Sequence, residues 1–151
     1  MRRKVILVED QDTDGTLFTR AFKKVGVEAG HELVWYRSGV DATEYIESVD
    51  FLRSPPDLMV VDINLQGVVG FDLLSRIRQR PTQGYVPVVM LSSSTQPADL
   101  RRCYALGGNS YLSKPQGYRE LKVIVERLIG YWLHTNRVPV IGQHVLRDLE
   151  A

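Results

Sequence analysis

The chain has 151 residues, of which 44% are hydrophobic and 25% charged, and its formal net charge is +1. This length predicts one compact domain with a single core and leaves no room for a separate DNA-reading domain. The basic residues are scattered, which argues against a nucleic-acid partner. The apolar runs are too short to span a membrane and none forms a signal peptide, so we expect a cytoplasmic protein. One cysteine and three scattered histidines offer neither an internal disulfide nor zinc-ligand spacing.

Short apolar runs alternate with helical patterns along the chain, which predicts five strand-then-helix units. Strands are predicted at 5–8, 32–36, 58–61, 87–91 and 110–112. The first helix is predicted from Asp12 to a stop at Gly26, and the second begins at Ser38, with Ala42, Tyr45, Ile46 and Val49 on its buried face. The third is predicted around Leu73 to Ile77, the fourth from Pro97 to Gly107-Gly108, and the fifth from Tyr118 to Trp132.

Five such units with short connections predict an α/β fold, in which right-handed crossovers wrap helices on both faces of a doubly wound parallel sheet. We expect the domain to span residues 4–133. Residues 134–151 form a C-terminal extension that lies outside the five units.

Polar side chains follow four of the predicted strands. Glu9 and Asp10 follow the first strand, Asp62 the third, Ser92 the fourth and Lys114 the fifth. Ligands of open α/β sheets collect at the carboxyl ends of the strands. One such residue is unremarkable, but five of suitable types at matching places predict a functional site.

Crowded carboxylates are unfavourable unless a cation joins them. Mg²⁺ prefers oxygen ligands, so we expect it on Asp10 and Asp62, with Glu9 acting through water and the main-chain carbonyl of Asn64 completing the set. A carboxylate oxygen of Asp62 can then attack a phosphoryl group while Lys114 and Ser92 share the charge of its oxygens.

These residues resemble the receiver domains of two-component response regulators. The resemblance covers about residues 4–133 and depends on Glu9-Asp10, Asp62 in Val-Asp-Ile-Asn-Leu, Ser92, and Lys114-Pro115 after Tyr-Leu-Ser. It implies a flavodoxin-like five-stranded sheet of order 2-1-3-4-5. It further implies phosphotransfer from a histidine kinase to Asp62, dependence on Mg²⁺, and slow self-catalysed loss of the phosphate as the only chemistry that the protein performs.

The resemblance also implies a cis peptide bond before Pro115 and a switch in which Tyr111 fills the space that Ser92 leaves when it moves toward the phosphate. Two positions depart from the family pattern. Gln66 stands where proline is common, and Ser92 replaces the more frequent threonine. Neither departure removes a ligand.

The C-terminal end is similar to that of single-domain regulators paired with bacterial phytochrome kinases, which implies such a kinase as partner and a homodimer. We expect the dimer interface to include Tyr131, Trp132, Val138, Val140 and Ile141. The alternative is a monomer in which the extension folds back on its own last helix.

Other functions remain open at this point. An aspartate-nucleophile phosphatase needs a second aspartate two positions after the first, where this chain has Asn64. A flavin-binding module of the same strand order needs a phosphate-cradling loop after the first strand, where Glu9 and Asp10 would repel phosphate. A receiver-fold interaction module that is never phosphorylated is the third alternative.

Overall fold

The computed structural model describes residues 2–67, 69–80 and 83–139. Five strands form one parallel sheet in the order β2-β1-β3-β4-β5. This confirms the predicted fold class and strand order. The strands are β1 (Lys4–Val8), β2 (Glu32–Tyr36), β3 (Leu58–Val61), β4 (Val88–Ser92) and β5 (Ser110–Ser113). The helices are α1 (Asp12–Phe22), α2 (Gly39–Glu47), α3 (Val49–Arg53), α4 (Gly70–Arg78), α5 (Pro97–Ala105) and α6 (Tyr118–Leu128).

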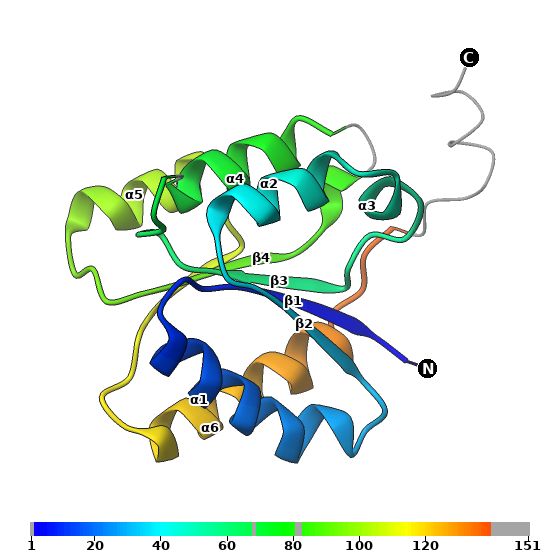
Figure 1. Ribbon diagram of the computed structural model, residues 1–151, viewed down its shortest axis with the longest axis vertical. Helices are drawn as coiled ribbons and strands as arrows, with labels where there is room; N and C mark the ends of the chain where they lie inside the picture. The colour runs from blue at the N-terminus through cyan, green and yellow to red at the C-terminus, as the bar shows by residue number, and fades with distance from the viewer. Residues whose placement is uncertain (1, 68, 81–82, 140–151) are drawn as a thin grey trace.

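The helices cover the sheet in two layers. Figure 1 shows α1 and α6 on one face and the other four helices on the opposite face. Successive side chains of a β-strand point to opposite faces of the sheet. In β1, Val5 and Leu7 pack with α1 and α6, whereas Ile6 and Val8 pack with α2 and α4. Two apolar cores therefore lie on either side of one sheet.

The second predicted helix is two helices, which corrects the sequence interpretation. Ser48 has an extended backbone (φ −78°, ψ 159°) and its hydroxyl accepts a hydrogen bond from the Phe51 amide, so it ends α2 and caps α3. The break rotates Val49 away from the predicted buried face, and this side chain is 57% exposed. Local capping of the backbone by serine outweighs continuation of the apolar pattern.

Two helices end later than a regular α-helical pattern predicts. α1 continues as a π-helical segment over Lys23–Val27, and the chain turns only at Gly30, whose φ is +81°. Gly26 is not the stop but is buried, and a Cβ atom there would meet the Phe22 ring at 2.5 Å. A second π-helical segment, Ile129–Leu133, extends α6. No helix in the described ranges is both long and apolar enough to cross a bilayer.

Candidate functional site

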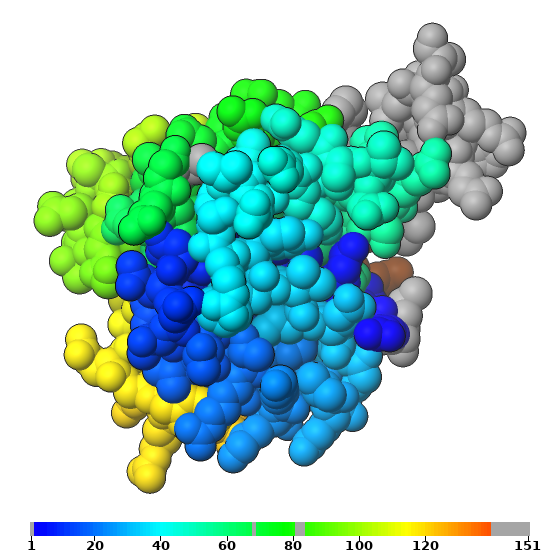
Figure 2. All heavy atoms as spheres, in the orientation of Figure 1, coloured from blue at the N-terminus to red at the C-terminus, as the bar shows by residue number. Residues whose placement is uncertain are grey.

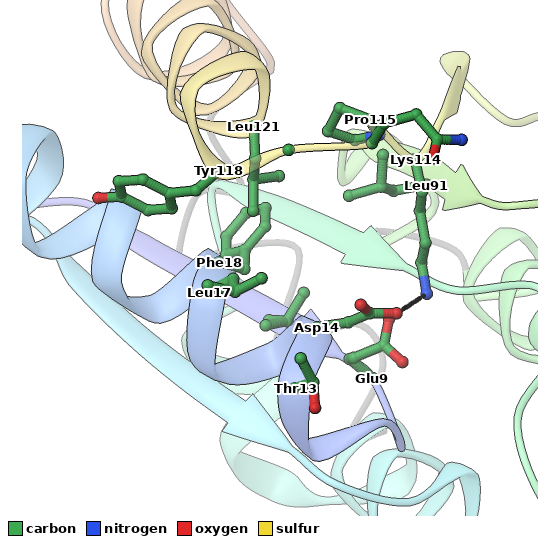
Figure 3. A pocket seen from close by; sticks show the side chains of 13 residues that line it. Glu9, Thr13, Asp14, Leu17, Phe18, Leu91, Lys114, Pro115, Tyr118 and Leu121 are labelled. Carbon is green, nitrogen blue, oxygen red and sulfur yellow. Dashed lines mark hydrogen bonds and ion pairs between the residues drawn. The ribbon is translucent and has the colours of Figure 1, made fainter.

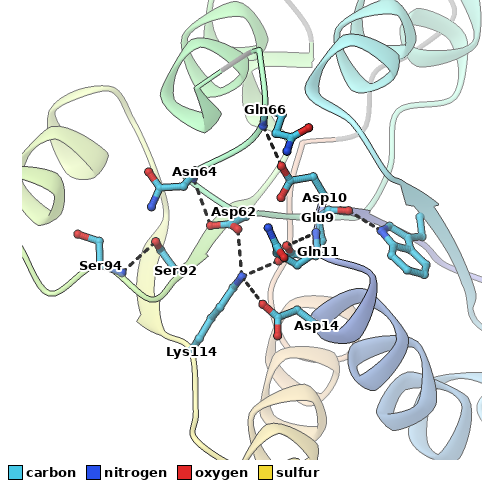
Figure 4. A network of polar contacts seen from close by, with 11 residues as sticks. Glu9, Asp10, Gln11, Asp14, Asp62, Asn64, Gln66, Ser92, Ser94 and Lys114 are labelled. Atoms are coloured by element: carbon cyan, nitrogen blue, oxygen red, sulfur yellow. Dashed lines mark hydrogen bonds and ion pairs between the residues drawn. The ribbon is translucent and has the colours of Figure 1, made fainter.

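The residues predicted to form a site meet at the carboxyl edge of the sheet, as Figure 4 shows. Glu9 follows β1, Asp62 follows β3 and Lys114 follows β5. Backbone hydrogen bonds continue past the strand ends and hold these positions: the Asp62 amide donates to Val8 at 3.0 Å, and the Lys114 amide donates to the Ser92 carbonyl at 2.8 Å. Rigid backbone therefore places side chains from distant parts of the chain together.

The Lys114 ammonium is the centre of the site. Its Nζ lies 2.7 Å from Glu9 Oε2, 2.8 Å from Asp14 Oδ2 and 3.0 Å from Asp62 Oδ2. An ammonium has three N–H donors, so these carboxylates use its whole donor capacity. Glu9 and Asp62 are almost completely buried, whereas Asp14 is about half exposed. Lys114 thus contacts two buried carboxylates and one, that of Asp14, which is partly exposed to solvent.

Burial and charge shift the proton affinities of this group. Burial raises the pKa of Glu9 to about 7, even though hydrogen bonds with Lys114 and with the Gln11 amide oppose the shift. Burial by itself would lower the pKa of Lys114, but its hydrogen bonds with Asp14, Glu9 and Asp62 together raise it. Lys114 is therefore positively charged at neutral pH, and Glu9 retains its proton to a higher pH than an exposed glutamate does.

The donor atoms of a cation site are present at the same edge. Oxygen atoms of Glu9, Asp10 and Asp62 all lie within 4.8 Å of one another. The Oδ2 atom of Asp10 accepts a hydrogen bond from the Gln66 amide at 2.8 Å, but its Oδ1 atom is buried and has no hydrogen-bond partner among the described residues. A buried carboxylate oxygen without a partner is costly. An all-oxygen set of this kind fits a hard divalent cation such as Mg²⁺.

The loop after β3 surrounds Asp62 with backbone groups. The Asn64 amide donates to Asp62 Oδ1 at 3.3 Å, while the Asn64 side chain is exposed. Asn64 also pairs with Val69 in a short antiparallel bridge that closes the loop. The loop therefore keeps the backbone of Asn64 beside Asp62.

Ser92 connects Asp62's edge to Tyr111 through hydrogen bonds. Ser92 is fully buried, and its hydroxyl accepts from the Ser94 amide at 3.2 Å. The Ser94 carbonyl in turn accepts from the Tyr111 hydroxyl at 2.8 Å. The half-buried ring of Tyr111 packs against the edge of the core. Ser92, the β4–α5 loop and Tyr111 are thus linked in series.

The predicted cis peptide bond is wrong for this structure. The described part of the chain contains no cis peptide bond, so Pro115 follows a trans bond. Trans is the lower-energy isomer of an X-Pro bond by about 0.5–1 kcal/mol. In this conformation Lys114 already reaches all three of its carboxylate partners.

Sequence analysis missed Asp14 and Trp35. Asp14 lies in the first turn of α1 and binds Lys114, and the Trp35 indole N–H donates to the Glu9 carbonyl at 2.8 Å. Asp14 had a partial signal, because it lies in the first turn of a helix that begins at this edge, but Asp12 of the same turn pairs with Arg37 instead. Trp35 had none, because its place depends on the pairing of β2 with β1.

A cavity of about 270 Å³ adjoins the Lys114 side of the site. Figure 3 shows Leu17 and Phe18 of α1 facing Leu121 of α6 across it, with Glu9, Asp14 and Lys114 at one end. The outer boundary of the site is therefore apolar on this side.

The residues expected at a dimer interface are only partly described. Tyr131 is 52% exposed and Val138 is 40% exposed, whereas Trp132 is half-buried and packs edge to face against Tyr131. Val140 and Ile141 lie outside the described residues.

The chain matches the model of the response regulator receiver domain family over residues 5–126. It belongs to this family. The order of its strands is that of a receiver domain. The resemblance noted from the sequence is confirmed.

Individual relatives are similar over most of their length. The receiver domain is 38% identical over 136 residues to the probable methanogenesis regulatory protein FilR2 of Methanothrix harundinacea, covering 89% of this chain and 86% of that protein. It is 31% identical over 137 residues to response regulator Rcp1 of a Synechocystis species, covering 89% and 92%.

Solved structures agree with the fold. The phosphorylated cyanobacterial phytochrome response regulator RcpA superposes with a TM-score of 0.83 at 33% identity, covering 93% of this chain and 100% of that one. The Mn²⁺-bound form of Rcp1 superposes with a TM-score of 0.79 at 31% identity, covering 91% and 99%.

Proposed function

We propose that this receiver domain accepts a phosphoryl group on Asp62 from a sensor histidine kinase. One observation carries the proposal: Asp62 is a buried carboxylate with Lys114 on one side and the unpartnered oxygen of Asp10 on the other. A buried carboxylate at the carboxyl edge of a parallel sheet, next to a cation and a cluster of carboxylate oxygens, suits attack on phosphorus.

The residues of the acidic cluster would hold Mg²⁺. Asp10 and Asp62 would bind it directly, Glu9 through water, and Asn64 through its main-chain carbonyl. When bound, Mg²⁺ supplies positive charge that offsets the phosphoryl oxygens and the crowded carboxylates. The Mn²⁺-bound form of Rcp1 supports a divalent ion in this family, and the unpartnered oxygen of Asp10 supports one in this chain.

In the reaction, a carboxylate oxygen of Asp62 forms a bond to phosphorus as the bond from phosphorus to the kinase histidine nitrogen breaks. The electron pair of that bond returns to the imidazole. Lys114 exchanges one carboxylate contact for a phosphoryl oxygen, and the Ser92 hydroxyl, now only accepting from Ser94, donates to another. The product is an acyl phosphate, which water removes slowly. The protein catalyses only these changes in its own state.

The series of hydrogen bonds from Ser92 supports the conformational response. A phosphoryl group adds about 1.5 to 2 negative charges and attracts the Ser92 hydroxyl toward Asp62. Because Ser94 holds both Ser92 and Tyr111, this movement pulls on the Tyr111 hydroxyl contact. Tyr111 then rotates into the space beneath α5, and the surface of α5 and β5 changes.

The first experiment is incubation with acetyl phosphate and Mg²⁺, followed by intact mass measurement. We expect a mass gain of one phosphoryl group that Asp62→Asn abolishes. Asp72→Asn, an exposed aspartate in the first turn of α4, is the matched control and should gain mass normally. Amide hydrogen exchange on the same samples should change around Ser94 and Tyr111 in the phosphorylated wild type and stay constant in Asp62→Asn.

The alternatives give different results. Continuous release of phosphate from a free ester would identify a phosphatase, and no mass gain with any donor would identify an unphosphorylated interaction module. Unchanged hydrogen exchange in a phosphorylated sample would refute the switch while leaving phosphorylation intact.

The partner that the relatives support is a bacterial phytochrome kinase. RcpA is a cyanobacterial phytochrome response regulator, and it covers nearly the whole of this chain. A kinase makes its phosphohistidine from ATP, so we place both proteins in the cytoplasm. In a transfer experiment, a phosphorylated phytochrome kinase should load Asp62 within seconds to minutes, and loading by unrelated histidine kinases only would refute this pairing.

A further inference from the structure

Two histidines that are far apart in the sequence meet at the edge opposite the acidic site. His31 lies just before β2, and His134 follows the π-helical segment at the end of α6. Their Nε2 atoms are 3.0 Å apart, and the rings meet edge to face with centroids 5.0 Å apart. His31 is buried, whereas His134 is exposed. In the sequence they are two of three scattered histidines that lack zinc-ligand spacing.

A backbone amide determines where the protons of this pair lie. The Arg3 amide nitrogen is 3.2 Å from Nδ1 of His31. An amide only donates, so Nδ1 must present its lone pair, and a neutral His31 then carries its proton on Nε2. This proton faces His134, whose Nε2 must therefore accept. Both rings are neutral in this arrangement, and His31 donates to His134.

The surrounding charges favour the neutral form of His31. Burial lowers the pKa of His31, a charge on His134 would lower it further, and the amino terminus and Arg3 act in the same direction, while Asp57 opposes them. Asp57 is itself engaged: its carboxylate accepts from the Arg3 guanidinium at 2.9 Å and from the Lys4 amide at 2.8 Å. No uncommitted carboxylate among the described residues balances a second positive charge here.

The histidine pair stands at the start of the C-terminal extension. After His134, the amides of Thr135 and Asn136 both donate to the Tyr131 carbonyl and turn the chain. Asn136 to Pro139 then line a hollow of about 400 Å³ together with Arg3, Asp57 and Trp132. In Figure 2 the orange atoms of this segment appear beside the dark blue N-terminus. The contact between the two rings therefore joins the first residue of the C-terminal extension to the rest of the domain.

We propose that His31 and His134 form a proton-operated clasp, which holds residues 135–139 beside Arg3 and Asp57 at neutral pH and releases them when His134 is protonated. Protonation places an N–H on His134 Nε2 opposite the N–H of His31. The Arg3 amide prevents His31 from moving its own proton to Nδ1, so two donors face each other. The clasp then opens, and residues 135–139 separate from Arg3 and Asp57. This device does not depend on phosphorylation of Asp62.

The same amide argues against a metal ion on the pair. A metal would need lone pairs on both Nε2 atoms, because only the unprotonated nitrogen binds it. The proton of His31 would then sit on Nδ1, directly opposite the Arg3 N–H. The geometry favours a proton between the rings over a Zn²⁺ or Ni²⁺ ion.

The test uses the full chain, and trypsin cleavage after Arg137 reports opening of the extension. His134→Gln keeps an acceptor for His31 but cannot be protonated, whereas His134→Phe removes the acceptor and keeps an aromatic ring. At pH 7.5 the wild type and His134→Gln should be cut at equal rates. At pH 5.5 the wild type should be cut about two- to tenfold faster than His134→Gln, the range expected for loss of one hydrogen bond. His134→Phe should be cut faster than His134→Gln at both pH values.

Comparison of variants at the same pH removes the pH dependence of trypsin itself. Nitrogen-15 spectra of the imidazoles at pH 7.5 should show a proton on Nε2 of His31 and none on Nδ1. A ratio of wild-type to His134→Gln cleavage that does not change with pH would overturn the proposal. So would a proton on His31 Nδ1, or stoichiometric binding of Zn²⁺ to both rings at pH 7.5.

Discussion

At the scale of single residues, the site depends on one lysine shared by three carboxylates. Glu9, Asp14 and Asp62 each contact the Lys114 ammonium, but only Glu9 and Asp62 are buried. A buried contact is worth more than an exposed one, because water screens the latter. Asp14 is therefore the partner that Lys114 loses most easily when a phosphoryl group arrives.

The raised pKa of Glu9 predicts how pH and Mg²⁺ act together on stability. Its folded pKa is about 7 and its unfolded value is near 4.5, so the folded protein binds more protons between these values. The stability that this proton provides is present below pH 4.5 and is lost as pH rises through 7. At pH 8.0 the metal-free site holds an additional buried negative charge, which Mg²⁺ would neutralise.

We therefore expect Mg²⁺ to raise the free energy of unfolding more at pH 8.0 than at pH 6.5, by on the order of 1 kcal/mol. Urea unfolding with and without a fixed Mg²⁺ concentration measures this difference. Histidine has an ordinary pKa near 6.5, so His31 also titrates in this interval, but its contribution cancels when samples with and without Mg²⁺ are compared at the same pH. Equal stabilisation at both pH values would contradict the assignment of Glu9 to the metal site.

At the scale of elements, the close approach of α4 to β3 positions Asp62. A Cβ atom on Gly70, the first residue of α4, would lie 2.1 Å from the Asp62 carbonyl oxygen and 2.9 Å from the Ile63 Cα. The Gly70 amide also donates to the Ile63 carbonyl at 2.7 Å. Only glycine allows the helix to begin this close to the backbone of Asp62 and Ile63.

Gly70→Ala should lower the free energy of unfolding by about 1–3 kcal/mol, because the backbone around Asp62 must move. It should also slow the mass gain from acetyl phosphate. Gly130→Ala is the matched control, because a Cβ there meets nothing within 4 Å in the described structure. That variant should be neutral or up to about 1 kcal/mol more stable. Equal stabilities for the two variants in urea would show that the α4 contact tolerates a side chain.

At the scale of the whole molecule, Tyr131 and Val138 leave apolar surface exposed where the C-terminal extension begins. We propose that this surface pairs two copies of the chain, with Trp132 and the residues that follow Pro139 adding to the interface. Sedimentation of the chain truncated after Leu133 tests the proposal: the full chain should be a dimer and the truncated chain a monomer. A dimer of unchanged stability after truncation would exclude the extension from the interface.

Treatment with acetyl phosphate tests whether dimerisation depends on the conformational switch. If phosphorylation alters the α5 and β5 surface alone, the dimer that depends on the extension should persist in the phosphorylated protein. A pH-dependent dimer that His134→Gln makes pH-independent would connect assembly to the histidine clasp instead.

Much of the fold could be predicted from local patterns, because each strand of a parallel sheet is buried on both faces and carries a continuous apolar run. The runs at 5–8 and 58–61 therefore predicted β1 and β3, and the residues directly after them predicted Glu9, Asp10 and Asp62. The site was predictable for the same reason. The sequence shows which residues directly follow a strand, and the carboxyl ends of parallel strands all lie at one edge of the sheet.

Tertiary structure decided the features that depend on contacts between distant segments. Asp14 joined the site because α1 packs against α6 and begins near Lys114, 100 residues away along the chain. The His31–His134 contact likewise depends on packing that no local pattern encodes. Local sequence specifies which backbone conformation is favourable, but only the closed sheet brings distant side chains within hydrogen-bond distance.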